Sequence, residues 1–585
     1  MVKITCPIAF LLIACNFAFS ESGERPPNVV VILTDDQGWG DLSINGNRNL
    51  ATPNIDSISR DGATFENFYV CQVCAPTRAE FLTGRYYPKT GVSGVSRGQG
   101  RLNPDETTVM ELFQSSGYAT GTFGKWHNGT QPPYHPNDRG IDEFYGFTSG
   151  HWGHYFSPPL DHNGKRVRGN GYVIDDFTDH AVTFIESNKD RPFFCYLPFN
   201  TPHSPMMVSD RFYDKFDGID LLMKHRDAGK EDVMMTRAAL AMCENIDFNV
   251  GRVLQRIDDL NLTGNTIVVF FSDNGPNSFR WNGGMKGKKG SIDEGGLRSP
   301  FFIRWPDKIS GGKSISQIAG AIDLLPTLTG LAGIKTKPAQ PIDGLSLVPL
   351  LTGESAQWKP RNLLSIKGNQ VSVRSQNHRL DSNGQLFDIS VDRGQRTNVA
   401  TQFPALTKQL EALAKRHAKE MQVHFEKNAN RPFMVGYSKS TTLPARDGIE
   451  HGTIKRSAKP PNNSFFTNWT SVDDSITWKI EIANSGVYEA IVFYTCAPGD
   501  EGATIQLSME NGSFVNNKVM EVFDPPLYDK SKERVANSHY FQKDFKPLSL
   551  GSFKLEKGRG TLTLSSPKIT GKQAIDVHSI DLILR

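Results

Sequence analysis

The sequence lacks a large excess of charge of one sign, a long apolar run and a dense set of cysteines. Its 585 residues carry 65 basic and 62 acidic side chains, which leaves a net charge of +3. Because no strong basic excess exists to neutralise phosphates, nucleic acid is not expected as the main partner. No stretch beyond the N-terminus is apolar and long enough for a transmembrane helix, which needs about 20 residues.

Cysteine is also scarce. Two of the seven cysteines, Cys6 and Cys15, lie near the N-terminus, so five remain, too few for a disulfide scaffold. Cys71 and Cys74 have the CxxC spacing of a redox or zinc pair, but the sequence has no second pair to complete a zinc site. Arg78, four residues after Cys74, indicates a different chemistry.

The first 20 residues have the pattern of a secretory signal peptide. Lys3 supplies the positive charge, residues 8–14 form a short apolar core, and residues 18–20 offer a small-x-small cleavage site. The apolar core is too short to span a bilayer as a helix. We therefore expect an exported protein, periplasmic or secreted. A lipid anchor at Cys15 is the alternative, because the residues before it resemble a bacterial lipobox.

The length and the changing pattern of the chain indicate several domains. Residues 26–360 alternate apolar strands with helical segments, which predicts an α/β domain with a mostly parallel central sheet flanked by helices. Residues 361–430 combine short strands with a helix at about 404–421, which indicates a smaller α+β subdomain that completes this unit. Residues 440–585 alternate short strands with turns, which predicts an accessory β-sandwich.

Oxygen-bearing side chains follow two of the predicted strands, residues 28–33 and 266–271. They are Asp35, Asp36, Asp273 and Asn274. An aspartate at a strand end is most often a turn-former. Two adjacent acceptor pairs at the same edge of a sheet, however, offer four ligands to a hard cation. We expect Ca²⁺, which tolerates irregular geometry, with Mg²⁺ as the alternative; no Cys/His spacing in the sequence suits zinc.

Basic side chains follow short turns at Arg78, Lys125 and Lys289. A single lysine or arginine is usually a solvated surface charge. Together with a divalent cation, these three would neutralise a tetrahedral oxyanion such as sulfate or phosphate. His127 and His203 offer proton donors and acceptors near neutral pH, although a lone histidine after a strand is more often structural.

The segment around Cys74 resembles the signature of the type I, formylglycine-dependent sulfatases of the alkaline-phosphatase superfamily. Residues 74–85 read CAPTRAEFLTGR, which contains the C-x-P-x-R core, with Thr77 where many members have serine. The similarity covers about residues 27–425. It includes GKWH at 124–127, PH at 202–203, EGG at 294–296, DLLPT at 323–327 and LFD at 386–388.

The resemblance implies a site chemistry. Cys74 would be oxidised to formylglycine (3-oxoalanine) by a formylglycine-generating or an anaerobic sulfatase-maturating enzyme. The hydrate of this aldehyde would attack sulfur and form a sulfo-enzyme intermediate. The implied metal ligands are Asp35, Asp36, Cys74, Asp273 and Asn274. The other implied roles are Arg78 holding the diol, His127 as the base that expels sulfate, Lys125 and Lys289 binding sulfate oxygens, and His203 protonating the leaving alcohol.

Two loops that mix aromatic and polar residues are expected near this site, at 150–155 and 277–282. Aromatic rings stack on sugars, and polar side chains reach hydroxyl or acidic groups. We expect His154, Arg280 and Asn282 to contact the substrate, with Arg280 pairing with a second anionic group. The expected substrate is a sulfated polysaccharide or oligosaccharide, either an algal galactan or a glycosaminoglycan. Simple packing is the alternative for the first loop.

Two rival functions belong to different classes. A phosphatase or phosphodiesterase of the same superfamily would place serine or threonine at the position of Cys74 and would need two zinc ions. A non-catalytic glycan-binding relative would lack the nucleophile or a metal ligand, and none is missing here. For the C-terminal β-sandwich, a structural role and carbohydrate binding both remain open.

Overall fold

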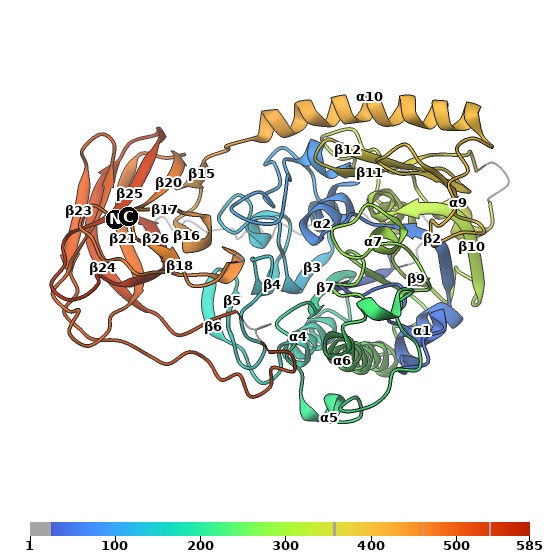
Figure 1. Cartoon of the computed structure of the whole chain (residues 1–585), viewed down its shortest axis with the longest axis horizontal. Helices are drawn as coiled ribbons and strands as arrows, with labels where there is room; N and C mark the ends of the chain where they lie inside the picture. Colours follow the sequence, from blue (N-terminus) through green and yellow to red (C-terminus); the bar gives the residue numbers. More distant parts are fainter. Residues whose placement is uncertain (1–24, 355–357, 460, 537–539) are drawn as a thin grey trace, which may run out of the picture.

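The computed structural model describes residues 25–354, 358–459, 461–536 and 540–585. The predicted signal peptide, residues 1–20, and the alternative anchor Cys15 lie outside these ranges. Within them, none of the helices combines the length and the apolar character needed to cross a membrane. Figure 1 shows a larger unit that carries the helices and a central sheet, and a smaller all-β unit formed by the C-terminal part of the chain.

One sheet forms the centre of the larger unit. Its strands are β1 (Asn28–Asp35), β2 (Ala63–Tyr69), β3 (Ala119–Lys125), β4 (Glu143–Phe147), β5 (Pro159–His162), β6 (Lys165–Arg168), β7 (Phe193–Pro202), β8 (Thr266–Ser272), β9 (Phe301–Arg304) and β10 (Lys313–Gly320). Their order in the sheet is β10-β2-β9-β8-β1-β7-β3-β4-β5-β6. The run β8-β1-β7-β3-β4 is parallel, and β9 is antiparallel to both its neighbours. The predicted mostly parallel sheet is confirmed.

Helices cover both faces of this sheet. They include α1 (Pro53–Arg60), α2 (Cys74–Thr83), α3 (Val109–Ser115), α4 (Val173–Ser187), α5 (Asp210–Tyr213), α6 (Val233–Asp259), α7 (Glu294–Leu297), α8 (Leu324–Leu331) and α9 (Val348–Thr352). Successive residues of β1 point to opposite faces. Val31 belongs to the same core cluster as Phe81 of α2, whereas Ile32 belongs to that of Leu240 of α6. Because β1 is apolar on both sides, it is buried along its whole length.

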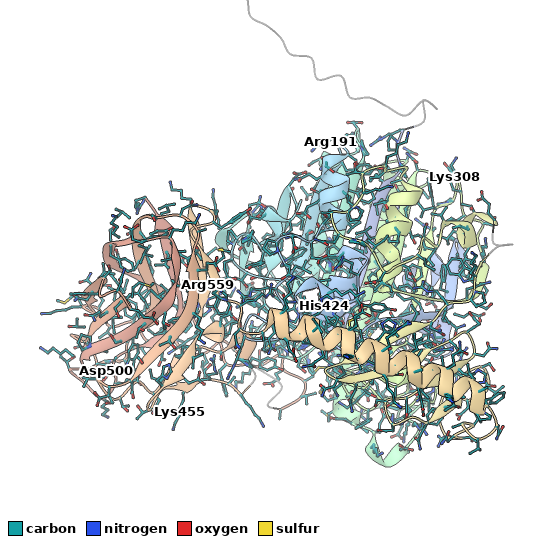
Figure 2. The ribbon with its side chains drawn as sticks, turned by 90° about the horizontal axis from the view of Figure 1, so that it is seen from above. Arg191, Lys308, His424, Lys455, Asp500 and Arg559 are labelled. Atoms are coloured by element: carbon teal, nitrogen blue, oxygen red, sulfur yellow. The ribbon has the colours of Figure 1, made fainter. Side chains whose placement is uncertain are left out.

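A small antiparallel sheet and a long helix complete the larger unit. They are β11 (Leu363–Lys367), β12 (Gln370–Arg374), β13 (His378–Leu380), β14 (Leu386–Asp388) and α10 (Pro404–Asn428). Met421 of α10 and Val371 of β12 share a core cluster with the central sheet. The helix continues past its predicted end at 421 because Phe425 still packs on Tyr87, with 6.0 Å between ring centroids. In Figure 2, His424 marks the end of α10 that lies nearer to the smaller unit.

The smaller unit consists of two facing sheets. Its strands are β15 (Phe433–Val435), β16 (Ser440–Pro444), β17 (Ile449–His451), β18 (Lys455–Arg456), β19 (Phe466–Thr467), β20 (Ser475–Ile482), β21 (Gly486–Thr495), β22 (Thr504–Met509), β23 (Phe514–Lys518), β24 (Lys546–Leu555), β25 (Gly558–Lys568) and β26 (Asp576–Leu584). The sheets have the orders β15-β20-β25-β22-β23 and β18-β19-β26-β21-β24. Trp478 and Tyr488, one from each sheet, belong to the same buried cluster. The predicted C-terminal β-sandwich is confirmed.

The connection between β23 and β24 leaves the smaller unit and lies against the larger one (Figure 1). Glu533 forms a β-bridge with Met207, and the Arg534 side chain donates to the carbonyl oxygen of Val208 at 2.7 Å. Arg534 and Lys532 both pair with Asp210 at the start of α5. These contacts follow directly after β7, so they bring the connection close to the carboxyl edge of the central sheet.

Candidate active site

The predicted oxygen ligands meet at the carboxyl ends of β1 and β8. These strands are parallel neighbours, with Thr34 aligned to Ser272, so the residues that follow them lie side by side. The backbone N–H of Asp36 donates to Asp273 Oδ1 at 3.2 Å, and Asn274 Nδ2 donates to Asp36 Oδ1 at 2.8 Å. All four predicted ligands, including Asp35, are at most 1% exposed. The structure therefore brings both acceptor pairs into one buried cluster.

Cys74 is the first residue of α2 and reaches the same cluster. Its Sγ and carboxylate oxygens of Asp35 and Asp273 lie within 4.8 Å of one another. Burial raises the pKa of the Cys74 thiol, although the charges of Lys125 and Lys289 oppose this. A buried, protonated thiol is a weak nucleophile. The chemistry of this position is therefore not that of a reactive thiolate.

Arg78 lies one helical turn after Cys74, on the same face of α2. Its Nη2 lies 2.8 Å from Asp273 Oδ2, and its Nη1 donates to the carbonyl oxygen of Lys125 at 2.7 Å. Burial raises the pKa of Asp273 to about 7, helped by the charge of Asp35 and opposed by Arg78. Arg78 is fully buried and joins α2 to the ends of β8 and β3. Its position is thus fixed by three elements.

The two predicted lysines face the acidic residues. Lys125, the last residue of β3, places Nζ 2.6 Å from Asp35 Oδ2, and Lys289 Nζ lies 2.6 Å from Asp36 Oδ1. Burial alone would raise the pKa of Asp36, but the charges of Lys289 and His203 overcome it and lower that pKa well below its usual range. Positive charge from the end of β3 and from the loop that holds Lys289 therefore converges on the carboxylates, as a site for an anion requires.

The donor set fits a hard divalent cation. Asp35 Oδ1 and Asn274 Oδ1 are buried and have no hydrogen-bond partner among the described residues. A buried acceptor without a partner is costly, and a cation bound by carboxylate and amide oxygens would satisfy both. The oxygens of these residues and of Asp36 and Asp273 suit Ca²⁺ or Mg²⁺, whereas zinc would be expected to have more histidine or cysteine.

Both predicted histidines lie beside this cluster. His203 follows β7; its Nε2 lies 3.7 Å from Asp36 Oδ2, and its Nδ1 is hydrogen-bonded to the carbonyl oxygen of Ser204 at 2.7 Å. Burial, together with the charge of Lys289, lowers the pKa of His203 to about 3. That bond orients the ring so that Nε2 faces the acidic cluster.

His127 has a left-handed backbone conformation, with φ of 66°, two residues after Lys125. Its Nε2 is hydrogen-bonded to the carbonyl oxygen of Val95 at 2.9 Å, and its buried Nδ1 has no hydrogen-bond partner in the described part of the chain. Burial, strengthened by the charge of Lys125, lowers the pKa of His127 well below its usual range. The ring is therefore neutral, as a proton acceptor must be.

Arg280 and Asn282, the predicted substrate contacts, both bond to protein groups in the structure. Arg280 is 1% exposed; it pairs with Asp41 at 2.6 Å and donates to the carbonyl oxygen of Asp36 at 2.9 Å. Asn282 accepts from the backbone N–H of Gly40 at 2.8 Å and donates to the carbonyl oxygen of Gly295 at 3.1 Å. Both side chains are used to brace the loop after β1, so their polar atoms face protein groups.

His154, the third predicted substrate contact, also bonds to protein groups. Its Nδ1 is hydrogen-bonded to the carbonyl oxygen of Phe156 at 2.9 Å, and its Nε2 to that of Asp529 at 2.8 Å. The ring thus fastens loop 150–155 to the connection between β23 and β24, and both nitrogens already have protein partners. This is the packing role that was left open for the loop.

Two residues that the sequence did not single out lie beside the site. The ring of His151 stacks with that of His203, at 5.8 Å between centroids and 16° between planes. On its other side, His151 stacks on Tyr540 of the connection between β23 and β24, at 4.0 Å and 27°. His151 belongs to loop 150–155, whose mixture of aromatic and polar residues indicated a position near the site. Nothing near Tyr540 in the sequence indicates this contact.

Comparison with known proteins agrees with this geometry. The profile of the sulfatase family matches residues 27–334, more than half of the chain. N-acetylgalactosamine-6-sulfatase from Mus musculus is 31% identical over 413 residues, which cover 63% of this chain and 75% of the relative. Steryl-sulfatase from Mus musculus is 30% identical over 452 residues, covering 61% of this chain and 70% of the relative.

A solved structure adds a comparison at the level of the fold. The crystal structure of Ps i-CgsB in complex with k-i-k-neocarrahexaose is 30% identical and has a TM-score of 0.62. The alignment covers 69% of this chain and 98% of that one. With the buried cluster of Cys74, paired acids and lysines, these similarities show that the chain belongs to the sulfatase family, in the alkaline-phosphatase-like superfamily, and is an enzyme that hydrolyses sulfate esters.

Proposed function

We propose that this sulfatase removes sulfate from a sulfated polysaccharide or oligosaccharide, of the algal galactan or glycosaminoglycan type, after Cys74 is converted to formylglycine. The observation that carries the proposal is the convergence of Cys74, two acceptor pairs and two lysines in one buried cluster. Support for a sugar substrate comes from the relatives, since one is named for N-acetylgalactosamine and another was crystallised with neocarrahexaose.

Asp35, Asp36, Asp273, Asn274 and residue 74 would hold the cation, Ca²⁺ in the first place and Mg²⁺ as the alternative. When bound, the cation and the hydrated aldehyde at residue 74 together supply an activated hydroxyl for attack on sulfur. Positioning falls to Arg78, whose place between Asp273 and the Lys125 carbonyl fixes the first turn of α2.

Lys125 and Lys289 are the groups that would receive the sulfate oxygens. In the structure their ammonium groups lie 2.6 Å from Asp35 and Asp36, respectively. A cation that takes over these carboxylates leaves the lysines available to the anion, so that bound sulfate replaces one ion pair with another. The burial of the cluster strengthens each of these interactions, because water is excluded.

His203 would donate a proton to the leaving alcohol, and His127 would accept one when sulfate is released. The ring of His203 faces the cluster from β7, on the side where His151 and Tyr540 stack. Its pKa of about 3 reflects burial and the charge of Lys289. A sulfate ester brings negative charge next to the ring and raises this pKa toward the range that an acid catalyst needs.

We further propose that the chain is exported to the periplasm or secreted, with a lipid anchor at Cys15 as the alternative. A formylglycine-generating or anaerobic sulfatase-maturating enzyme would be its maturation partner.

The test combines a mass measurement with an activity screen. In protein from the native host, the peptide that contains Cys74 should carry an aldehyde in place of the thiol. The same preparation should release sulfate from carrageenan or glycosaminoglycan oligosaccharides, and Cys74→Ala should not. Conversion without release from any glycan, with hydrolysis of aryl sulfates only, would contradict the substrate class; a thiol that is never converted would contradict the proposed chemistry.

A further inference from the structure

A cavity of about 790 Å³ lies between the two units of the molecule. From the larger unit it is lined by Ser204, Asn277 and Lys288, and from the smaller unit by Lys459 and Tyr540. The C-terminal unit therefore supplies part of its wall. The described contacts of Arg534 with Val208 and Asp210 hold this wall in place.

This cavity is lined by residues that lie next to site residues in the chain. Ser204 is the residue after His203, and Asn277 belongs to the loop that follows the ligands Asp273 and Asn274. The side chain of Asn277 donates to the carbonyl oxygen of Pro202 at 3.0 Å, which joins the two loops at the cavity wall. A glycan whose sulfate ester lies beside His203 would thus extend its neighbouring sugar into the cavity.

The lining of the cavity is basic. Lys288 donates to the carbonyl oxygen of Asn277 at 3.3 Å, and neither Lys288 nor Lys459 forms an ion pair with a carboxylate in the described part of the chain. A third lysine, Lys230, pairs with Asp227 at 3.3 Å. The acidic side chain in the lining, Asp232, accepts from the backbone at the start of α6. Lys288 and Lys459 therefore bring positive charge to the cavity from two different units, and lysines outnumber carboxylates in its lining.

Aromatic rings accompany these charges. Lys288 Nζ lies 5.2 Å from the ring centroid of Phe279, which also lines the cavity. Tyr540 lines it as well and is stacked on His151. Rings held in this way can pack against a sugar face, while ammonium groups beside them take an acidic substituent.

We propose that the cavity is a binding site for a second anionic group of the same glycan, a sulfate or a carboxylate on the sugar next to the one that is desulfated. Lys288 and Lys459 bind this group, and Tyr540 and Phe279 contact the ring. The inference rests on the proposed function and deepens it. It gives the C-terminal unit a part in choosing the substrate, and it places the second-anion contact on these lysines instead of Arg280.

Binding to the full-length Cys74→Ala chain, which cannot turn over, tests the inference by calorimetry. The probes are three disaccharides: one with a single sulfate ester, one with two, and one with a sulfate ester and a uronate carboxylate. Lys288→Gln and Lys459→Gln should each weaken binding of a doubly charged probe by about 5-fold, the size expected for a partly exposed charge pair. Binding of the singly sulfated probe should change less than about 2-fold. The two doubly charged probes distinguish sulfate from carboxylate.

Lys479→Gln, an exposed lysine of β20 that is absent from the cavity lining, serves as the matched control and should leave all three probes unaffected. In matured enzyme that retains Cys74, Lys459→Gln should raise KM for the doubly charged glycan, with a smaller effect on kcat. Equal losses on all probes, or none, would overturn the second-anion site while sulfate release by the parent enzyme still supports the proposed function. If the parent enzyme releases sulfate from no glycan, the proposed function fails and the inference fails with it.

Discussion

Arg280 and Asp41 form an ion pair in which both side chains are 1% exposed, with Nη2 and Oδ2 2.6 Å apart. The same guanidinium donates to the carbonyl oxygen of Asp36, and Asp41 accepts from the backbone N–H of Gly38 at 2.7 Å. Asp36 has φ of 68°, a left-handed conformation that few residues other than glycine adopt without support. The pair therefore holds the loop after β1 in the shape that places Asp36 in the cluster.

Arg280→Gln should destabilise the protein strongly, because it leaves the buried Asp41 carboxylate without an opposite charge. Breaking such a pair costs about 3–5 kcal/mol. Chemical denaturation measures this loss. The control is Arg559→Gln, at a residue labelled on the smaller unit in Figure 2; it disrupts an exposed pair with Glu481 and should cost less than about 1 kcal/mol. Activity should fall equally on an aryl sulfate and on a glycan. A loss confined to the glycan would restore Arg280 as a substrate contact.

Asn274→Ala should weaken the binding of the cation, because it removes one of the two ligand oxygens, Asp35 Oδ1 and Asn274 Oδ1, that are buried without a hydrogen-bond partner among the described residues. The Ca²⁺ concentration for half-maximal activity should rise by about tenfold or more, which corresponds to at least about 1.4 kcal/mol of binding free energy. A chelator should abolish activity and lower Tm, since a bound ligand stabilises the folded state. A Tm that does not respond to chelator or to added Ca²⁺ would contradict the site.

His203→Ala should reduce kcat more for a substrate whose leaving group must be protonated than for one whose leaving group departs as a stable anion. On a glycan sulfate, whose leaving group is an alcohol, we expect a loss of about 10²-fold or more. On 4-nitrophenyl sulfate, whose leaving group departs as a stable anion, the loss should be much smaller. Steady-state kinetics on both substrates checks this, and equal losses would show that His203 only positions other groups.

Glu80 should make stability depend on pH. It is buried in α2, and burial raises its pKa to about 8, although a hydrogen bond from the Cys71 thiol opposes this. Because the folded pKa lies above the unfolded value of about 4.3, the contribution of neutral Glu80 is complete below about pH 4 and is lost as the pH rises through 8.

Glu80→Gln should therefore lose less stability than the parent protein between pH 6 and pH 9 in urea denaturation. Glu426→Gln, at an exposed position of α10, is the matched control and should follow the parent curve. Parallel curves for Glu80→Gln and the parent would show that Glu80 does not titrate in this range.

Much of the site could be predicted because it is built from local patterns. The strand at 28–33 is apolar on both faces, so its burial follows from the sequence. The position of a ligand site at its carboxyl end follows as well, because open α/β sheets bind ligands at that edge. The same holds for the strand before Asp273, whereas Cys74 and Arg78 were identified by the C-x-P-x-R motif and not by a predicted helix. Asp35 and Asp273 each lie at the end of a strand whose type is evident from its own residues.

The contacts that could not be predicted depend on partners far along the chain. The Arg280 side chain points into the protein because it pairs with Asp41, which lies 239 residues away in the sequence. Glu294 appeared only as part of a resembling motif, yet it pairs with Arg298 and, at 3.0 Å, with Arg379, both fully buried. Hydrophobic periodicity carries no information about such pairs. For this reason Arg280 and Asn282 were predicted to face the substrate, whereas in the structure their polar atoms face protein groups.

The complete burial of α2 limits the period in which another enzyme can reach Cys74. All ten residues from Cys74 to Thr83 are buried, so another enzyme cannot reach this segment once the sheet has closed over it. Asp273, which completes that closure by pairing with Arg78, is 195 residues further along the chain. At a synthesis rate of about 5–20 residues per second, roughly 10–40 s pass between the appearance of the two. The maturating enzyme proposed above for Cys74 would therefore have to find this residue in the nascent or still unfolded chain, and a molecule that folds before that encounter would stay inactive.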